Sequence, residues 1–152
     1  MTVMIRRAGK QDIETMIPML SELFSIETDF VIDAEKQRAG LSLLLSDSDK
    51  RIVFVAADDA GDVAGMVTAQ LVASTAAGGY GALLEDMFVC ERYRRSGVGK
   101  SLLTAVKDWA SEKGAKRIQL LADRRNRPAL VFYTGHHFSE SSMRGFYLKL
   151  NE

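Results

Sequence analysis

A glycine-containing segment that leads into a helical pattern is the part of the chain best suited to bind an anion. It spans residues 94–101, where Gly97 and Gly99 let the backbone approach a ligand closely. The first amides of a helix have no carbonyl partner, and the helix dipole is positive at that end, so phosphates bind there readily. Two arginines and a lysine add positive charge to the segment. The spacing therefore predicts a phosphate-binding loop.

Two kinds of phosphate loop are compatible with parts of this segment. Gly99-Lys100-Ser101 resembles the end of a P-loop, and the apolar residues 118–122 before Asp123 resemble a strand that ends in a magnesium-binding aspartate. A P-loop also needs a glycine five residues before Gly99, and Arg94 occupies that position. The pattern Arg/Gln-x-x-Gly-x-Gly/Ala, in contrast, fits the segment from Arg94 without a substitution. A P-loop phosphotransferase is therefore the second choice of enzyme.

The elements that position this loop alternate between helical and extended patterns. Apolar residues at helical spacing predict helices from Asp12, from Asp33, from Gly97 to Gly114 and over residues 126–133. Runs rich in β-branched residues predict strands over residues 3–5, 51–57, 63–72, 83–90, 118–122 and 143–150. This order predicts an α/β domain with a mixed sheet.

Length, composition and charge narrow the class of protein. The 152 residues contain no repeat or linker, so we expect one domain over residues 1–152. The 20 Lys and Arg balance the 20 Asp and Glu, which removes the general electrostatic case for binding nucleic acid or an anionic membrane. We find neither a secretory signal nor an apolar run long enough to span a membrane. With Cys90 as the single cysteine, we expect a cytoplasmic protein without a metal site.

Three separate segments resemble the GNAT superfamily of acetyl-CoA-dependent N-acetyltransferases. The predicted phosphate loop has the form of the family's pyrophosphate loop. The strand before it is similar to the fourth strand of the small-molecule members that acetylate polyamines and diamines, and a later helix is similar to the family's second acetyl-CoA motif. The order of elements also agrees. The segments are Arg94-x-x-Gly97-x-Gly99, Leu84-Glu85-Asp86-Met87-Phe88-Val89 with Tyr93-Arg94, and Asn126-x-x-Ala129-x-x-Phe132-Tyr133 with Phe138.

The resemblance implies a single-domain GNAT fold. Its mixed central sheet would have about six or seven strands, with helices on both faces and with strands 4 and 5 splayed apart. One departure is His137, which stands where most members have a glycine. The resemblance also implies a homodimer. Acetyl-CoA would be the co-substrate, and a small amine would be the acceptor substrate.

The resemblance further implies direct transfer of an acetyl group to a primary amine, which is a cationic amine if the acidic residues contact it. Glu85 would take the proton from the amine, and Tyr133 would protonate the departing thiolate. Glu27, Asp29 and Asp86 would contact the amine. The residues expected to bind acetyl-CoA are Met87, Phe88, Val89, Arg94, Arg95, Ser96, Gly97, Val98, Gly99, Lys100, Ser101, Asn126, Ala129 and Phe132.

Structural roles remain open for several of these residues. Glu85 and Asp86 are also compatible with the polar side of a strand, and strand alternation puts the two on opposite faces of the sheet. Tyr133 is also compatible with a core aromatic residue, and Glu27 and Asp29 with solvated loop charges. A non-catalytic domain that binds acyl-CoA is the alternative outside the enzymes.

Overall fold

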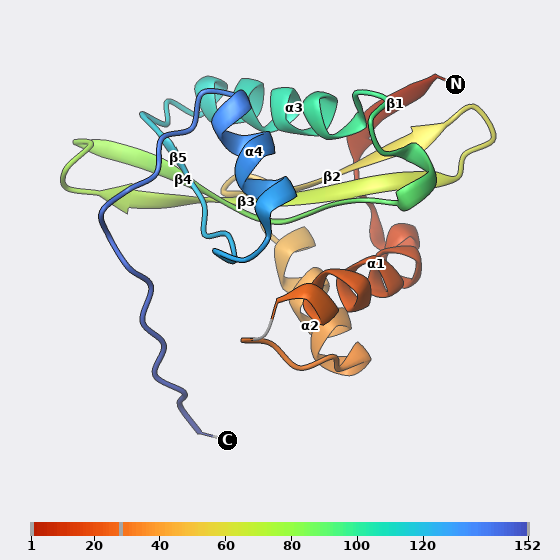
Figure 1. Ribbon diagram of the computed structural model, residues 1–152, viewed down its shortest axis with the longest axis horizontal. Helices are drawn as coiled ribbons and strands as arrows, with labels where there is room; N and C mark the ends of the chain where they lie inside the picture. Colours follow the sequence, from red (N-terminus) through yellow and green to blue (C-terminus); the bar gives the residue numbers. More distant parts are fainter. Residues whose placement is uncertain (1, 28, 152) are drawn as a thin grey trace. The chain divides into compact units, whose positions relative to one another are not determined.

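The computed structural model describes residues 2–27 and 29–151 (Figure 1). The chain divides into two compact units, Met1–Leu120 and Leu121–Glu152. The first unit contains β1 (Val3–Arg7), α1 (Ile13–Ile26), α2 (Ala34–Leu45), β2 (Arg51–Asp58), β3 (Val63–Ser74), β4 (Gly79–Val89), α3 (Val98–Glu112) and β5 (Ile118–Gln119). The second unit contains α4 (Arg127–Gly135). Within the described residues, no helix combines the length and the apolar character that a membrane span requires.

The strands of the first unit form one sheet in the order β1-β2-β3-β4-β5. Neighbours from β1 to β4 are antiparallel, whereas β5 runs parallel to β4, so the predicted mixed sheet is confirmed. β5 pairs with β4 only through Ala82–Ile118 and Leu83–Gln119. From Leu84 to Val89, β4 has no partner in β5.

The predicted number of six or seven strands is wrong for the residues that the structure describes, which contain five. Residues 143–150 were expected to form a strand and do not, and their large apolar side chains are exposed. Such a run fits a pleated, half-buried surface, but it becomes a strand only where a sheet edge pairs with its backbone. No strand is present among residues 121–151 to offer that edge.

Helices cover both faces of the sheet in the first unit, as predicted (Figure 1). On one face, α1 and α2 pack against the sheet through a core that includes Met16, Leu20, Leu41, Val55 and Met66. α3 covers the other face. Its buried residues are Val98, Leu102, Leu103, Val106, Trp109 and Ala110.

Polar side chains fix where the helices of the first face begin. Asp33 caps α2 as predicted, because its Oδ1 accepts hydrogen bonds from the amides of Glu35 and Lys36 at 3.1 and 3.2 Å. Before α1, the buried carboxylate of Asp12 accepts two hydrogen bonds from the Arg6 guanidinium at 2.8 and 2.9 Å. These contacts hold the first residues of α1 and α2 in place.

Candidate active site

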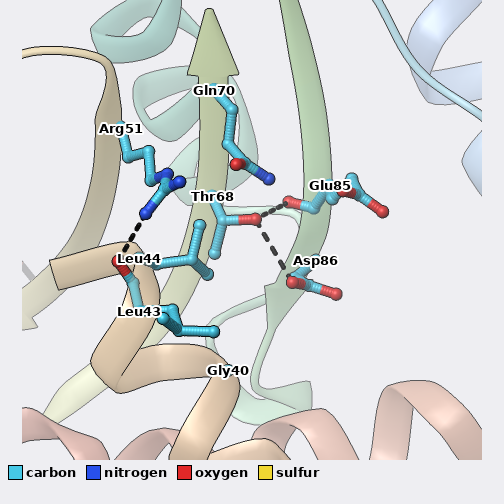
Figure 2. A pocket seen from close by; sticks show the side chains of 8 residues that line it. All are labelled: Gly40, Leu43, Leu44, Arg51, Thr68, Gln70, Glu85 and Asp86. Atoms are coloured by element: carbon cyan, nitrogen blue, oxygen red, sulfur yellow. Dashed lines mark hydrogen bonds between the residues drawn. The ribbon is translucent and has the colours of Figure 1, made fainter. Parts of the chain in front are cut away.

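A β-bulge in β4 brings two carboxylates to the same side of the sheet. Between the pairs Met66–Phe88 and Thr68–Glu85, two residues of β4 face one residue of β3. The first of these two is Asp86, whose φ of 52° lies in the left-handed region that aspartate tolerates better than most residues. Glu85 and Asp86 consequently line one pocket (Figure 2). The expectation from regular alternation, that they lie on opposite faces, is wrong.

The pocket that both residues line has a volume of about 270 Å³. Its floor comes from three adjacent strands, because Arg51 pairs with Gln70 and Thr68 pairs with Glu85 across the sheet. α2 contributes the remaining residues. We call this the acceptor pocket, and it consists of Gly40, Leu43, Leu44, Arg51, Thr68, Gln70, Glu85 and Asp86.

The two carboxylates of the acceptor pocket differ in their environment. Asp86 is partly buried, and Glu85 is more exposed. Burial, together with the negative charge of Glu85, raises the pKa of Asp86 to about 6. Desolvation also raises the pKa of Glu85 above its ordinary value. Both carboxyl groups of the pocket therefore have pKa values above those of their exposed forms.

Thr68 holds Asp86 in position from the neighbouring strand. Its side chain is buried, and its hydroxyl lies 3.2 Å from Oδ2 of Asp86 and 3.1 Å from the backbone oxygen of Glu85. A hydroxyl has one hydrogen, so it donates to one of these acceptors at a time. Its bond to Asp86 favours the ionised carboxylate and opposes the effect of burial on the pKa.

The loop predicted to bind phosphate ends at the N-terminus of α3. Gly97 precedes the helix with a φ of 86°, a conformation that favours glycine. The backbone oxygen of Gly97 accepts from the Ser101 amide at 3.0 Å, so the amides ahead of Ser101 have no carbonyl partner within the helix. Arg95 and Lys100 are exposed beside them. These groups fit a pyrophosphate.

Other residues predicted to bind acetyl-CoA have contacts within the first unit. Arg94 donates from Nε to the backbone oxygen of Val89 at 2.8 Å, and its guanidinium lies 5.4 Å from the centre of the Phe88 ring. Phe88 and Val98 are buried, and the Ser96 hydroxyl donates to a backbone oxygen. Arg94 therefore ties the loop to the end of β4.

The remaining predicted residues lie in the second unit. Asn126 caps α4, because its side-chain oxygen accepts from the amide of Ala129 at 3.3 Å. The partly buried ring of Tyr133 contacts the rings of Phe132 and Phe138, with centres 5.3 and 5.5 Å apart. The role of the Tyr133 hydroxyl as an acid stays a prediction.

The acidic residues proposed outside β4 do not line the acceptor pocket. Glu27 follows the last turn of α1, and Asp29 is exposed. Three polar residues that do line it, Arg51, Thr68 and Gln70, were not predicted from the sequence. A signal was present in β3, since Thr68 and Gln70 stand two residues apart in an otherwise apolar run and so share one face.

An α/β unit with a carboxylate-lined pocket on its sheet, and with a helix N-terminus of unpaired amides after β4, has the parts of a group-transfer enzyme. Residues 17–138 match the Acetyltransferase (GNAT) family, so the chain belongs to this family. Members of this family are acetyltransferases, and acetyl-CoA is their co-substrate. The predicted family is thereby confirmed. Within the described residues, no three His, Cys, Asp or Glu side chains are grouped as a metal site would need.

Individual relatives agree with the family. The chain is 37% identical over 60 residues to the uncharacterized N-acetyltransferase YhfO of Bacillus subtilis (strain 168), a match that spans 40% of each chain. It is 42% identical over 57 residues to streptothricin acetyltransferase A of the same organism, over 38% of this chain and 33% of the relative. The chain thus matches less than half the length of these two relatives.

One solved structure is similar to this chain over almost its whole length. It is an aminoglycoside acetyltransferase, meta-AAC0020, from an uncultured soil metagenomic sample, solved in complex with sisomicin. The TM-score is 0.77 at 25% identity, and the alignment covers 98% of this chain and 97% of the other.

Proposed function

We propose that this protein transfers the acetyl group of acetyl-CoA to a primary amine bound in the acceptor pocket. The single observation that carries the proposal is the partly buried carboxylate of Asp86, held by Thr68 in a pocket of small-molecule size. A cationic amine is attracted by two adjacent carboxylates, and this supports the expectation of a small cationic acceptor. Polyamines and diamines, the class that the form of β4 implies, are one candidate class of such acceptors.

Acetyl-CoA would bind along the end of β4 and at the start of α3. The free amides before Ser101 and the charges of Arg95 and Lys100 would hold its pyrophosphate. Backbone amides near Phe88 and Val89 are the candidates to polarise the thioester carbonyl. The co-substrate supplies an activated acetyl group on sulfur.

The amine must lose protons for the reaction to proceed. An alkylammonium ion with a pKa of about 10.4 first gives one proton to a base and becomes a nucleophile. Its nitrogen then forms a bond to the thioester carbon, and the carbon–sulfur bond breaks. A second proton leaves the nitrogen, and the thiolate takes up one proton, for which Tyr133 is the proposed donor. One proton is released to solvent in each cycle.

The environment of the two pocket carboxylates favours Asp86 as the base. The sequence pattern assigned this role to Glu85 and assigned contact with the amine to Asp86. A carboxylate with a pKa near 6 is mostly ionised at pH 7, and it is a stronger base than an ordinary carboxylate. We therefore propose that Asp86 takes the proton and that the more exposed Glu85 attracts the ammonium group.

Asp86→Asn and Glu85→Gln separate these roles in an assay of CoA release with a panel of amines. We expect Asp86→Asn to lower kcat by about 10²- to 10⁴-fold with acetyl-CoA binding unchanged, as for loss of a general base. Glu85→Gln should chiefly raise the KM for the amine. Asp59→Asn, in an exposed turn, is the matched control. A larger kcat loss in Glu85→Gln would return the role of base to Glu85.

Isothermal titration with acetyl-CoA tests the loop independently of the acceptor. A protein that binds acetyl-CoA but acetylates no amine would be a non-catalytic acyl-CoA-binding domain. Tight binding of ATP in place of acetyl-CoA would contradict the whole proposal.

A further inference from the structure

The acceptor pocket contains a cation on the side opposite its two carboxylates. Arg51 lies on β2, whereas Glu85 and Asp86 lie on β4, with β3 between them. Neighbouring strands are about 4.8 Å apart, so the backbones of these two walls are separated by about 10 Å. Figure 2 shows Arg51 on one side of Thr68 and Gln70, and Glu85 and Asp86 on the other side.

The Arg51 guanidinium keeps hydrogen-bond donors for a ligand. One nitrogen, Nη1, donates to the backbone oxygen of Leu43 at 3.1 Å, which fixes the side chain against the end of α2. Among residues 2–27 and 29–151, none of the ion pairs includes Arg51. A guanidinium has five N–H donors, so further ones are available to an acceptor group in the pocket.

We propose that the acceptor is an amine that also carries an anionic group, an amino acid or a related amino carboxylate, and that Arg51 binds its carboxylate. This inference rests on the proposed function and names the substrate class of the same pocket. The amine lies toward Asp86 and Glu85, and the carboxylate lies toward Arg51. The geometry matches a small zwitterion whose positive end meets the acidic wall and whose negative end meets the basic wall.

The physical argument is charge pairing at both ends of the pocket. A guanidinium binds a carboxylate through two parallel hydrogen bonds, a geometry that an ammonium group does not offer. A polyamine would place a second positive charge near Arg51 and leave that guanidinium unpaired. Gln70, which pairs with Arg51 across the strands, has an amide that can hydrogen-bond to the middle of the ligand.

The test compares amines that differ only in the carboxylate. Wild-type protein and acetyl-CoA are assayed with leucine, leucinamide and isoamylamine, and with ornithine and putrescine, by release of CoA. We expect kcat/KM to be about 10- to 100-fold higher for each amino acid than for its carboxylate-free partner, the range expected for hydrogen bonds to a charged group.

Substitutions at Arg51 show whether this preference arises in the pocket. Arg51→Gln should reduce the preference to less than about 3-fold by raising the KM of the amino acids, and Arg51→Lys should retain part of it. Arg7→Gln, on the exposed side of β1, is the control and should keep the wild-type preference. If Arg51→Gln fails to fold, Arg51→Lys and the wild-type comparison carry the test.

Direct binding separates this inference from the proposed function. Titration of each amino acid into the protein with CoA present should show binding that weakens in the Arg51 variants. Such binding without turnover would overturn the proposed function and support the inference. Turnover that favours putrescine or isoamylamine, or a preference unchanged in Arg51→Gln, would overturn the inference and leave amine acetylation standing. Absence of both binding and turnover would overturn both.

Discussion

Thr68 shows how one buried hydroxyl adjusts the chemistry of the acceptor pocket. Burial and the charge of Glu85 raise the pKa of Asp86, and the hydrogen bond from Thr68 lowers it. The balance of these effects gives Asp86 a pKa of about 6, so Asp86 is mostly ionised at pH 7 and more basic than an exposed aspartate.

Thr68→Val removes the hydroxyl and keeps the shape of the side chain. Because the bond from Thr68 favours ionised Asp86, its loss should move the pKa of Asp86 above about 6. The acid limb of the kcat/KM profile should move to higher pH, so activity should fall more at pH 6 than at pH 8. Profiles recorded for the variant, the wild type and Thr68→Ser test this. An unchanged acid limb in Thr68→Val would assign Thr68 a structural role alone.

At the scale of elements, contacts between consecutive elements position α1 and α2 on their face of the sheet. The pair between Arg6 of β1 and Asp12 before α1 is the strongest example, since Asp12 is buried and also accepts from the amide of Gly9 at 2.8 Å. The hydrogen bonds from Arg6 hold the pKa of Asp12 below its ordinary value. Ionised Asp12 therefore stabilises the fold above pH 4, and this contribution is lost as the pH falls through its folded pKa.

Arg6→Gln should lower the free energy of unfolding by about 1 to 2 kcal/mol at pH 7, a value reduced for the partial exposure of Arg6. The difference from the wild type should shrink below pH 4, where Asp12 becomes protonated in the unfolded chain. Urea unfolding at several pH values measures this. Lys10→Gln, at an exposed neighbouring position, is the control. A pH-independent difference would mean that the pair with Asp12 is not its source.

At the scale of the whole molecule, the candidate residues are distributed over two units. The first unit contains the acceptor pocket and the α3 terminus, and the second contains Tyr133. Residues 139–151 of the second unit have no regular secondary structure and are exposed throughout. They include the apolar side chains of Met143, Phe146 and Leu148, which are 85%, 88% and 86% exposed.

Limited proteolysis with chymotrypsin should cut first among residues 143–150, because exposed backbone without regular structure is the preferred site of nicking. Mass spectrometry should then identify a fragment that ends near Phe146. Trp109 is 3% exposed in α3 and should be cut only after unfolding. Resistance of residues 143–150 under conditions that cut the exposed Phe30 would contradict their exposed placement.

The sequence by itself determined the family and most of the elements. Gly97 and Gly99 at the start of α3, the cap at Asp33 and the acidic pair of β4 are local patterns. Local patterns depend on backbone conformation and hydrogen bonding over a few residues. The number of strands, in contrast, does not follow from local patterns. Residues 143–150 have the composition of a strand, but pairing depends on an edge that another part of the chain must supply.

Only the tertiary structure decided what the acceptor pocket contains. The bulge at Asp86 depends on the register between β3 and β4, which no pattern within β4 reveals. The same register, with that of β2, brings Arg51, Thr68 and Glu85 to one face although they are far apart in the sequence. Because charge pairing and desolvation depend on distances across strands, the roles proposed for Asp86 and Arg51 rest on the assembled sheet.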